Sequence, residues 1–193
     1  YIYSRRLNLG QFRKDSDVLW TLAPHDISIV NYWLDEIPMQ VTARGLQYAN
    51  PQRGLPEVCF SQIDYPSGRT AQFHLSWLDP QKCREMVIIG SKKMLVYDDT
   101  QADRMIQIYD KSVEDGYNDA PEDITDFRSR LRAGDTVIPN FRMTEPLSNE
   151  ITEFISCIIN NREPLTNGLH GTQTVAVMEA MATSIRNNGS AVE

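Results

Sequence analysis

The stretch "RTAQFHLSW", residues 69–77, decides the fold class because its apolar and polar residues alternate without a break. The apolar positions are Ala71, Phe73, Leu75 and Trp77, and the positions between them are polar. Successive side chains of a strand point to opposite faces, so a strand of this kind has one buried face and one solvent-facing face. The stretch therefore predicts a strand of an antiparallel sheet that is covered on one side only.

The segments around this strand carry related patterns. Residues 1–10 read as an opening strand, and further strands are predicted at 39–49, 56–65, 85–99, 105–110 and 135–140. The tripeptide "PSG" (66–68) predicts a turn, Gly90 and Ser91 break the 85–99 run at a hairpin turn, and the acid-rich segment 111–134 predicts a surface excursion. Consecutive strands with short connections indicate a largely antiparallel sheet.

Three amphipathic helices accompany these strands. Residues 27–37 hold Ile27, Val30, Leu34 and Ile37 at spacings of 3, 4 and 3, and Pro38 ends the pattern. Two helices close the chain, with apolar faces made of Leu147, Ile151, Phe154, Ile155 and Ile158 and of Val175, Met178, Ala182 and Ile185. The order predicts an α+β fold of two layers: an open-faced, mainly antiparallel β-sheet with helices packed on one face.

The composition is that of an ordinary globular chain. Of its 193 residues 41% are hydrophobic, and no apolar run approaches the roughly 20 residues of a membrane span. A formal charge of −7 argues against a nucleic-acid partner, because such binders neutralise phosphates. Cys59, Cys83 and Cys157 are scattered without metal-ligand spacing, which favours reduced thiols in a cytoplasmic protein and predicts no metal site. We therefore expect neither nucleic acid nor membrane as a partner.

His25 is the first candidate for chemistry, because nothing at the start of the helix in "LWTLAPHDISIVNYWL" (19–34) requires a histidine. Thr21 lies four residues earlier and hence on the same helix face. Imidazole titrates near neutrality and can take a proton from a hydroxyl group, while a nearby helix N-terminus disfavours imidazolium. From these residues alone, a structural role and a catalytic role both stay open. His74, on a polar strand face, and His170, in a loop, are predicted to be surface or packing residues.

The opening strand supplies a second candidate cluster. Ser4, Arg6 and Asn8 alternate onto one face, Arg13 follows, and no acidic residue precedes Asp15. Guanidinium groups bind phosphate in a bidentate way, so Arg6, Asn8 and Arg13 are candidates for holding an anionic substrate, although a solvated strand face explains the pattern almost as well. The chain has neither the dinucleotide fingerprint GxGxxG nor a phosphate loop, and it lacks GxSxG and HExxH.

Three runs carry a resemblance to a known family. They are "YSRRLNLGQFRKDSDVLWTLAPHDISIVNYWL" (3–34), "YPSGRTAQFHLSWLDPQKCREMVIIGSKKMLVYDD" (65–99) and "EPLTNGLHGTQTVAVMEAMATSI" (163–185). Together they resemble the C-terminal domain of the Gfo/Idh/MocA oxidoreductases, above all members that act on nucleotide sugars. The resemblance implies that residues 1–193 form a single C-terminal domain for substrate binding and oligomerisation. It also implies that NAD(P) and a Glu-Lys-Pro catalytic segment belong to an N-terminal Rossmann domain absent from this chain.

The family's Asp-x-x-x-His pattern aligns its active-site histidine with His25 and its aspartate with Thr21. The resemblance then implies hydride transfer between nicotinamide and a carbon of a sugar or nucleotide sugar, with His25 assisting the proton. A hydroxyl cannot supply the charge of an aspartate, and Asp26 lies about 100° around the helix from His25. A non-catalytic sugar-binding or oligomerisation relative that has lost the carboxylate is therefore the alternative. We further expect a homo-dimer or tetramer through the open sheet face, and a chain that by itself is inactive and binds NAD(H) weakly.

Overall fold

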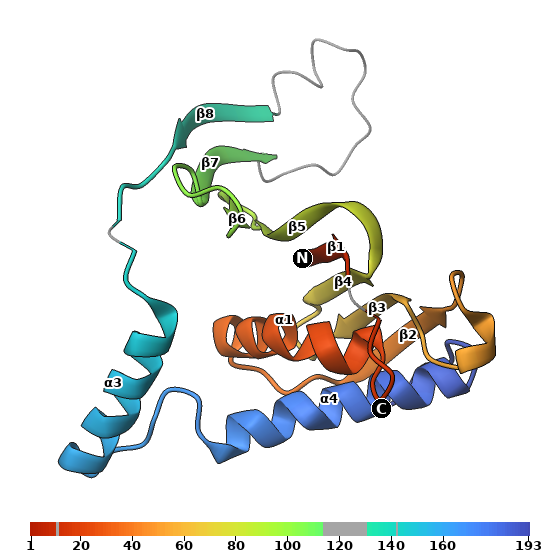
Figure 1. Ribbon diagram of the computed structural model, residues 1–193. Helices are drawn as coiled ribbons and strands as arrows, with labels where there is room; N and C mark the ends of the chain where they lie inside the picture. The colour runs from red at the N-terminus through yellow and green to blue at the C-terminus, as the bar shows by residue number, and fades with distance from the viewer. Residues whose placement is uncertain (11, 114–130, 142) are drawn as a thin grey trace.

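The computed structural model describes residues 1–10, 12–113, 131–141 and 143–193, which form an eight-stranded sheet in the order β2-β3-β4-β1-β5-β6-β7-β8 (Figure 1). The strands are β1 (Ile2–Leu9), β2 (Gln40–Leu46), β3 (Val58–Asp64), β4 (Thr70–Ser76), β5 (Leu78–Ile89), β6 (Met94–Asp98), β7 (Ile106–Val113) and β8 (Leu131–Val137). β1 lies between β4, which runs parallel to it, and β5, and every other neighbouring pair is antiparallel. The prediction of an α+β, mainly antiparallel, open-faced sheet is confirmed.

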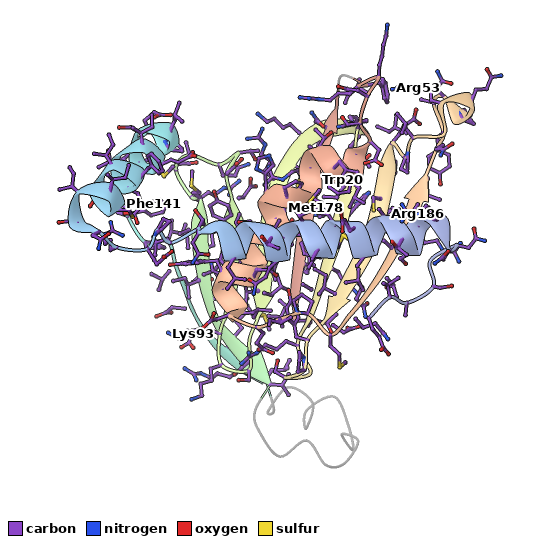
Figure 2. All side chains as sticks on the ribbon, turned by 90° about the horizontal axis from the view of Figure 1, so that it is seen from below. Trp20, Arg53, Lys93, Phe141, Met178 and Arg186 are labelled. Carbon is purple, nitrogen blue, oxygen red and sulfur yellow. The ribbon has the colours of Figure 1, made fainter. Side chains whose placement is uncertain are left out.

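Two helices cover one face of this sheet. α1 (Val18–Leu34) contacts β1, β3 and β4, while α4 (Gly168–Arg186) contacts β2 and packs on α1. Figure 2, seen from below, shows α4 crossing both the strands and α1, with Met178 midway along α4. The core lies between these helices and the sheet, where all four apolar residues of the 69–77 alternation are buried. On α4 the buried face contains Val177, Met178 and Met181, and the predicted face member Val175 is exposed.

α1 begins nine residues earlier than the apolar spacing predicts. Asp17 caps the helix, since its side-chain oxygen accepts the N–H of Trp20 at 2.9 Å, and the helix ends at Leu34 with Asp35 in the left-handed conformation at φ 49°. Pro24 lies inside the helix, although proline usually marks a helix boundary. His25 is consequently near the middle of α1, and the expectation that a helix N-terminus acts on it is wrong.

α3 (Pro146–Asn160) stands apart from the other two helices, to the side of the sheet (Figure 1). Its predicted apolar face exists but is uncovered. The five residues of that face are between 49% and 65% exposed, namely Leu147, Ile151, Phe154, Ile155 and Ile158. The prediction that helices pack on the sheet therefore holds for α1 and α4 and fails for α3, because amphipathic spacing shows which face is apolar but not what covers it.

Three strand boundaries differ clearly from the sequence prediction. β5 begins at Leu78, one residue after the end of β4, β7 extends to Val113, and β8 spans Leu131–Val137 instead of 135–140. Of the predicted excursion 111–134, the first three residues belong to β7 and the last four to β8, while 114–130 lie outside the described residues. No helix in the described ranges is long and apolar enough to cross a membrane.

A buried carboxylate organises the connection between β2 and β3, which includes the short 3-10 helix η1 (Pro51–Arg53). Glu57 is 2% exposed, and its oxygens accept the backbone N–H groups of Tyr48, Ala49 and Asn50 at 2.9, 2.7 and 3.0 Å. Burial acts to raise the pKa of Glu57, but these three donors and Arg53 outweigh it and hold the pKa below its usual range. The neighbouring carbonyl of Pro56 accepts the N–H of Val18 at 3.1 Å, so this connection also fixes the start of α1.

Candidate active site

His25 lies on the partly exposed side of α1 within the electrostatic reach of two arginines. Partial burial lowers the pKa of His25 below its usual value, and the charges of Arg6 on β1 and Arg84 on β5 lower it further. The carboxylate of Asp26 opposes these effects without outweighing them. The imidazole is therefore neutral near pH 7, which is the form that accepts a proton.

Asp26 points inward from α1 to the inner face of β1. Its carboxylate is 1% exposed and accepts Arg6 Nη2 at 2.5 Å on Oδ1, with Arg6 Nε at 3.0 Å from Oδ1 and 3.1 Å from Oδ2. Ser4 Oγ donates to Oδ2 at 2.9 Å. The predicted common face of Ser4 and Arg6 is therefore seen directly. Within the described chain Arg6 Nη1 makes no hydrogen bond, so Arg6 keeps one nitrogen for a ligand.

Three residues of this site escaped the sequence analysis. Arg84 is the direct neighbour of Arg6 across the β1–β5 pair, and its Nη1 lies 3.4 Å from Asp99 Oδ2. Tyr97 on β6 lies among these groups: burial raises the pKa of its hydroxyl, the carboxylate of Asp99 raises it further, and Arg6 and Arg84 oppose the rise. Only strand register brings these three residues together, and the sequence prediction started the strand of Arg84 one residue too late to include it.

Thr21 does not pair with His25. Its Oγ1 donates to the carbonyl of Asp17 at 2.8 Å and lies 3.3 Å from Ser16 Oγ, so the hydroxyl serves the first turn of α1. Among the described residues no hydrogen bond joins it to the imidazole. The structure places Thr21 on the helix of His25, as the spacing predicts, but gives it no partner in the charged cluster.

Asn8 and Arg13, the other two predicted substrate-binding residues, lie outside this cluster. Asn8 is half-buried beyond Arg6, where the register of β1 against β5 shifts between Leu7 and Leu9. Arg13 is exposed in the connection from β1 to α1. The structure thus unites Arg6 with His25 and leaves Asn8 and Arg13 outside the network around Asp26.

Two cavities meet at Tyr97. The first, of about 560 Å³, is lined by the polar side chains of Lys82, Arg84, Asp99 and Thr100 and by the apolar Met105, Met143 and Pro146. The second, of about 490 Å³, is mainly apolar and is lined by Ile29, Tyr32, Trp33 and Ile106. A polar ligand rich in hydroxyl groups suits the first cavity, and a flat ring suits the aromatic wall of the second.

The remaining histidines lie elsewhere. His74 is on the opposite face of the sheet and stacks on Phe60 with ring centroids 4.3 Å apart. His170 is in the first turn of α4 and not in a loop, and its Nε2 lies 2.9 Å from Ser28 Oγ. Nowhere in the part of the chain that the structure describes do three or more His, Cys, Asp or Glu side chains gather as a metal site would require.

The family model "Oxidoreductase family, C-terminal alpha/beta domain" matches residues 11–193. The chain belongs to the Gfo/Idh/MocA oxidoreductase family and corresponds to the C-terminal domain of its members. No curated protein matches the chain by sequence.

Solved structures share the fold at low identity. UDP-N-acetylglucosamine 3-dehydrogenase GnnA from Acidithiobacillus ferrooxidans is 18% identical, with a TM-score of 0.77 over 97% of this chain and 55% of that one. An aldose-aldose oxidoreductase from Caulobacter crescentus is 15% identical, with a TM-score of 0.74 over 100% of this chain and 54% of that one. An NAD-binding protein from Listeria innocua is 16% identical, with a TM-score of 0.72 over 100% of this chain and 58% of that one. The chain spans about half the length of these relatives.

Proposed function

We propose that residues 1–193 form the substrate-binding domain of an NAD(P)-dependent oxidoreductase that moves a hydride between nicotinamide and a carbon of a sugar or nucleotide sugar. The family assignment and the named activities of GnnA and of the aldose-aldose oxidoreductase support this proposal. The observation that carries it is the imidazole of His25, kept neutral by partial burial and by the charges of Arg6 and Arg84, with Arg84 also lining the cavity beside Tyr97.

In this proposal His25 is the general base. Its neutral ring accepts the proton of a substrate hydroxyl while the hydride leaves the same carbon. The cations of Arg6 and Arg84 stabilise the negative charge that develops on the hydroxyl oxygen as the proton leaves. They also disfavour an imidazolium, so the partly exposed ring passes the proton on to water.

The cofactor fits this chain only in part. NAD(P)⁺, when bound, supplies the hydride acceptor. Tyr32, Trp33 and Tyr97 offer an apolar wall that would hold the nicotinamide ring. These 193 residues lack the glycine-rich turn that binds a pyrophosphate, so we assign the phosphates to an N-terminal Rossmann domain outside them. By itself the chain would then be inactive and would bind NAD(H) weakly.

The open sheet face supports a homo-dimer or tetramer. Phe60 is 47% exposed there, and a hollow of about 500 Å³ beside it is lined by Tyr3, Arg44, Gln62 and Gln72. We propose that a second copy covers this face, with about 2,000 Å² or more buried in all. The three free cysteines support a cytoplasmic location.

The test replaces His25 with Asn in a protein that contains the Rossmann domain. We expect kcat to fall about 10²-fold or more, the usual scale of general acid–base help, with little change in melting temperature. Lys92→Asn, in the exposed turn between β5 and β6, is the control. A variant with near-normal kcat that melts many degrees lower would show that the histidine is structural. A wild-type protein that binds sugars without turnover would favour the non-catalytic alternative, which the threonine at position 21 suggests.

A further inference from the structure

Two arginines face each other on the inner side of the sheet. Arg6 of β1 and Arg84 of β5 are direct cross-strand partners, an arrangement in which like charges repel. Each has an acidic partner, but the two partners differ. Asp26 binds Arg6 through several short contacts and is almost fully buried, whereas Asp99 reaches Arg84 only at 3.4 Å near the surface.

The Asp26 contact holds Arg6 in one orientation. Three donor–acceptor contacts join the two side chains, and Ser4 Oγ fixes the second carboxylate oxygen from the same strand. A guanidinium held bidentately has little freedom to swing toward solvent. Asp26 also follows His25 directly in α1, so one helix carries both the proposed base, His25, and the carboxylate that orients Arg6.

We propose that Asp26 is a positioning residue, which acts through Arg6 by fixing the guanidinium beside His25. In this chain the carboxylate next to the histidine in sequence is engaged with Arg6, while the Thr21 hydroxyl, at the position of the family's aspartate, is engaged with Asp17. The catalytic part of the inference rests on the proposed function, because it concerns the base of that reaction.

The charges around His25 indicate how the Asp26–Arg6 pair acts on its imidazole. The charges that act on its ring are those of Arg6 from β1, Asp26 from α1 and Arg84 from β5. Of the charges acting on the ring, that of Arg6 has the largest effect, and it favours the neutral form. An arginine fixed in place therefore keeps the base unprotonated and presents a cation to the developing alkoxide.

One experiment separates this charge effect of Arg6 on His25 from a general loss of structure. NMR titration of the full-length protein follows the rings of His25, His74 and His170, with His25 assigned through the loss of its signal in His25→Gln. Arg6→Gln should raise the pKa of His25 and leave His74 unchanged. The matched control Arg5→Gln changes the next residue, which points to the opposite face beside Glu85, and should raise the pKa of His74 while leaving His25 unchanged.

A kinetic cycle tests whether Asp26 acts through Arg6. The double variant Arg6→Gln/Asp26→Asn keeps two amides that can hydrogen-bond and leaves no buried charge unpaired, so it should fold even where Asp26→Asn alone does not. We expect kcat of the double variant to fall about 10²-fold and to equal that of Arg6→Gln alone, with KM little changed. Rescue by Arg6→Lys should be incomplete, since lysine restores the charge without the bidentate geometry.

Two outcomes would overturn the inference. The first is a His25 titration that Arg6→Gln leaves unchanged. The second is a double variant whose kcat loss is the product of the losses from separate changes at the two residues. If the wild-type protein shows no turnover, the proposed function fails, and the titration still decides whether Arg6 sets the charge of His25.

Discussion

Replacing Glu57 with Gln removes one negative charge from a side chain that holds three backbone N–H groups. A glutamine oxygen in the place of Oε2 can keep the bonds from Tyr48 and Ala49, while its NH₂ group then faces the N–H of Asn50. One lost bond costs about 1–3 kcal/mol, and two bonds that change from charged to neutral lose about 1 kcal/mol each. Together these terms amount to about 3–5 kcal/mol of the free energy of unfolding. Because Tyr48, Ala49 and Asn50 are exposed and water can reach their N–H groups, we expect a loss of about 3 kcal/mol, at the lower end of this range.

The assay is thermal unfolding followed by circular dichroism. For a chain of this size a loss of about 3 kcal/mol lowers the melting temperature by about 6–12 °C. The folded protein holds the pKa of Glu57 below its unfolded value, so the carboxylate stabilises fully above the unfolded pKa and less as pH falls through the folded one. The difference in melting temperature between wild type and variant should therefore become smaller toward acid pH.

Glu150→Gln, on the exposed surface of α3, is the matched control and should melt like the wild type. The reasoning is refuted if Glu57→Gln melts within about 1 °C of the wild type at pH 7, since three buried hydrogen bonds predict a larger change. A gap that widens toward acid pH would show instead that the folded state does not depress the pKa of this carboxyl.

Two further predictions concern the site and the open face. Thr21→Asp should raise the pKa of His25, because a carboxylate on the same helix face favours imidazolium; an unchanged NMR titration would place position 21 outside the electrostatic reach of the ring. Phe60→Asp should convert the dimer or tetramer to monomers in sedimentation velocity while the circular dichroism spectrum stays the same, because Phe60 is exposed on the uncovered face. A wild-type protein that is already monomeric at high concentration would contradict the assembly.

The fold was predictable where the signal is local. The alternation in 69–77 shows both the strand and its buried face without knowledge of any partner. The start of α1 was missed because the apolar stripe was followed only from Ile27, although Leu19 and Ala23 continue it toward the N-terminus by whole turns. The first half of β5 is largely polar, and within it only Leu78 and Cys83 are paired with β1, so its residue pattern alone does not predict a strand.

The candidate site was predictable only in part. His25 stands out through the family pattern, but Arg84 and Tyr97 join it through strand register, which a single sequence does not contain. The angle argument placed Asp26 correctly off the face of His25. It did not predict that Asp26 pairs with Arg6, because the strand against which a helix packs depends on the tertiary structure and not on the helix sequence.

The position of β1 has a consequence for the order of folding. Ile2 pairs with Ala71 on one side and with Ile88 on the other, so the strand that comes first in this domain's sequence lies inside the finished sheet. Until the ribosome has released β4 and β5, β1 has no partner on either edge, while β2, β3 and β4 can already form hairpins. Such non-local closure slows folding and leaves a strand open to pairing with other chains.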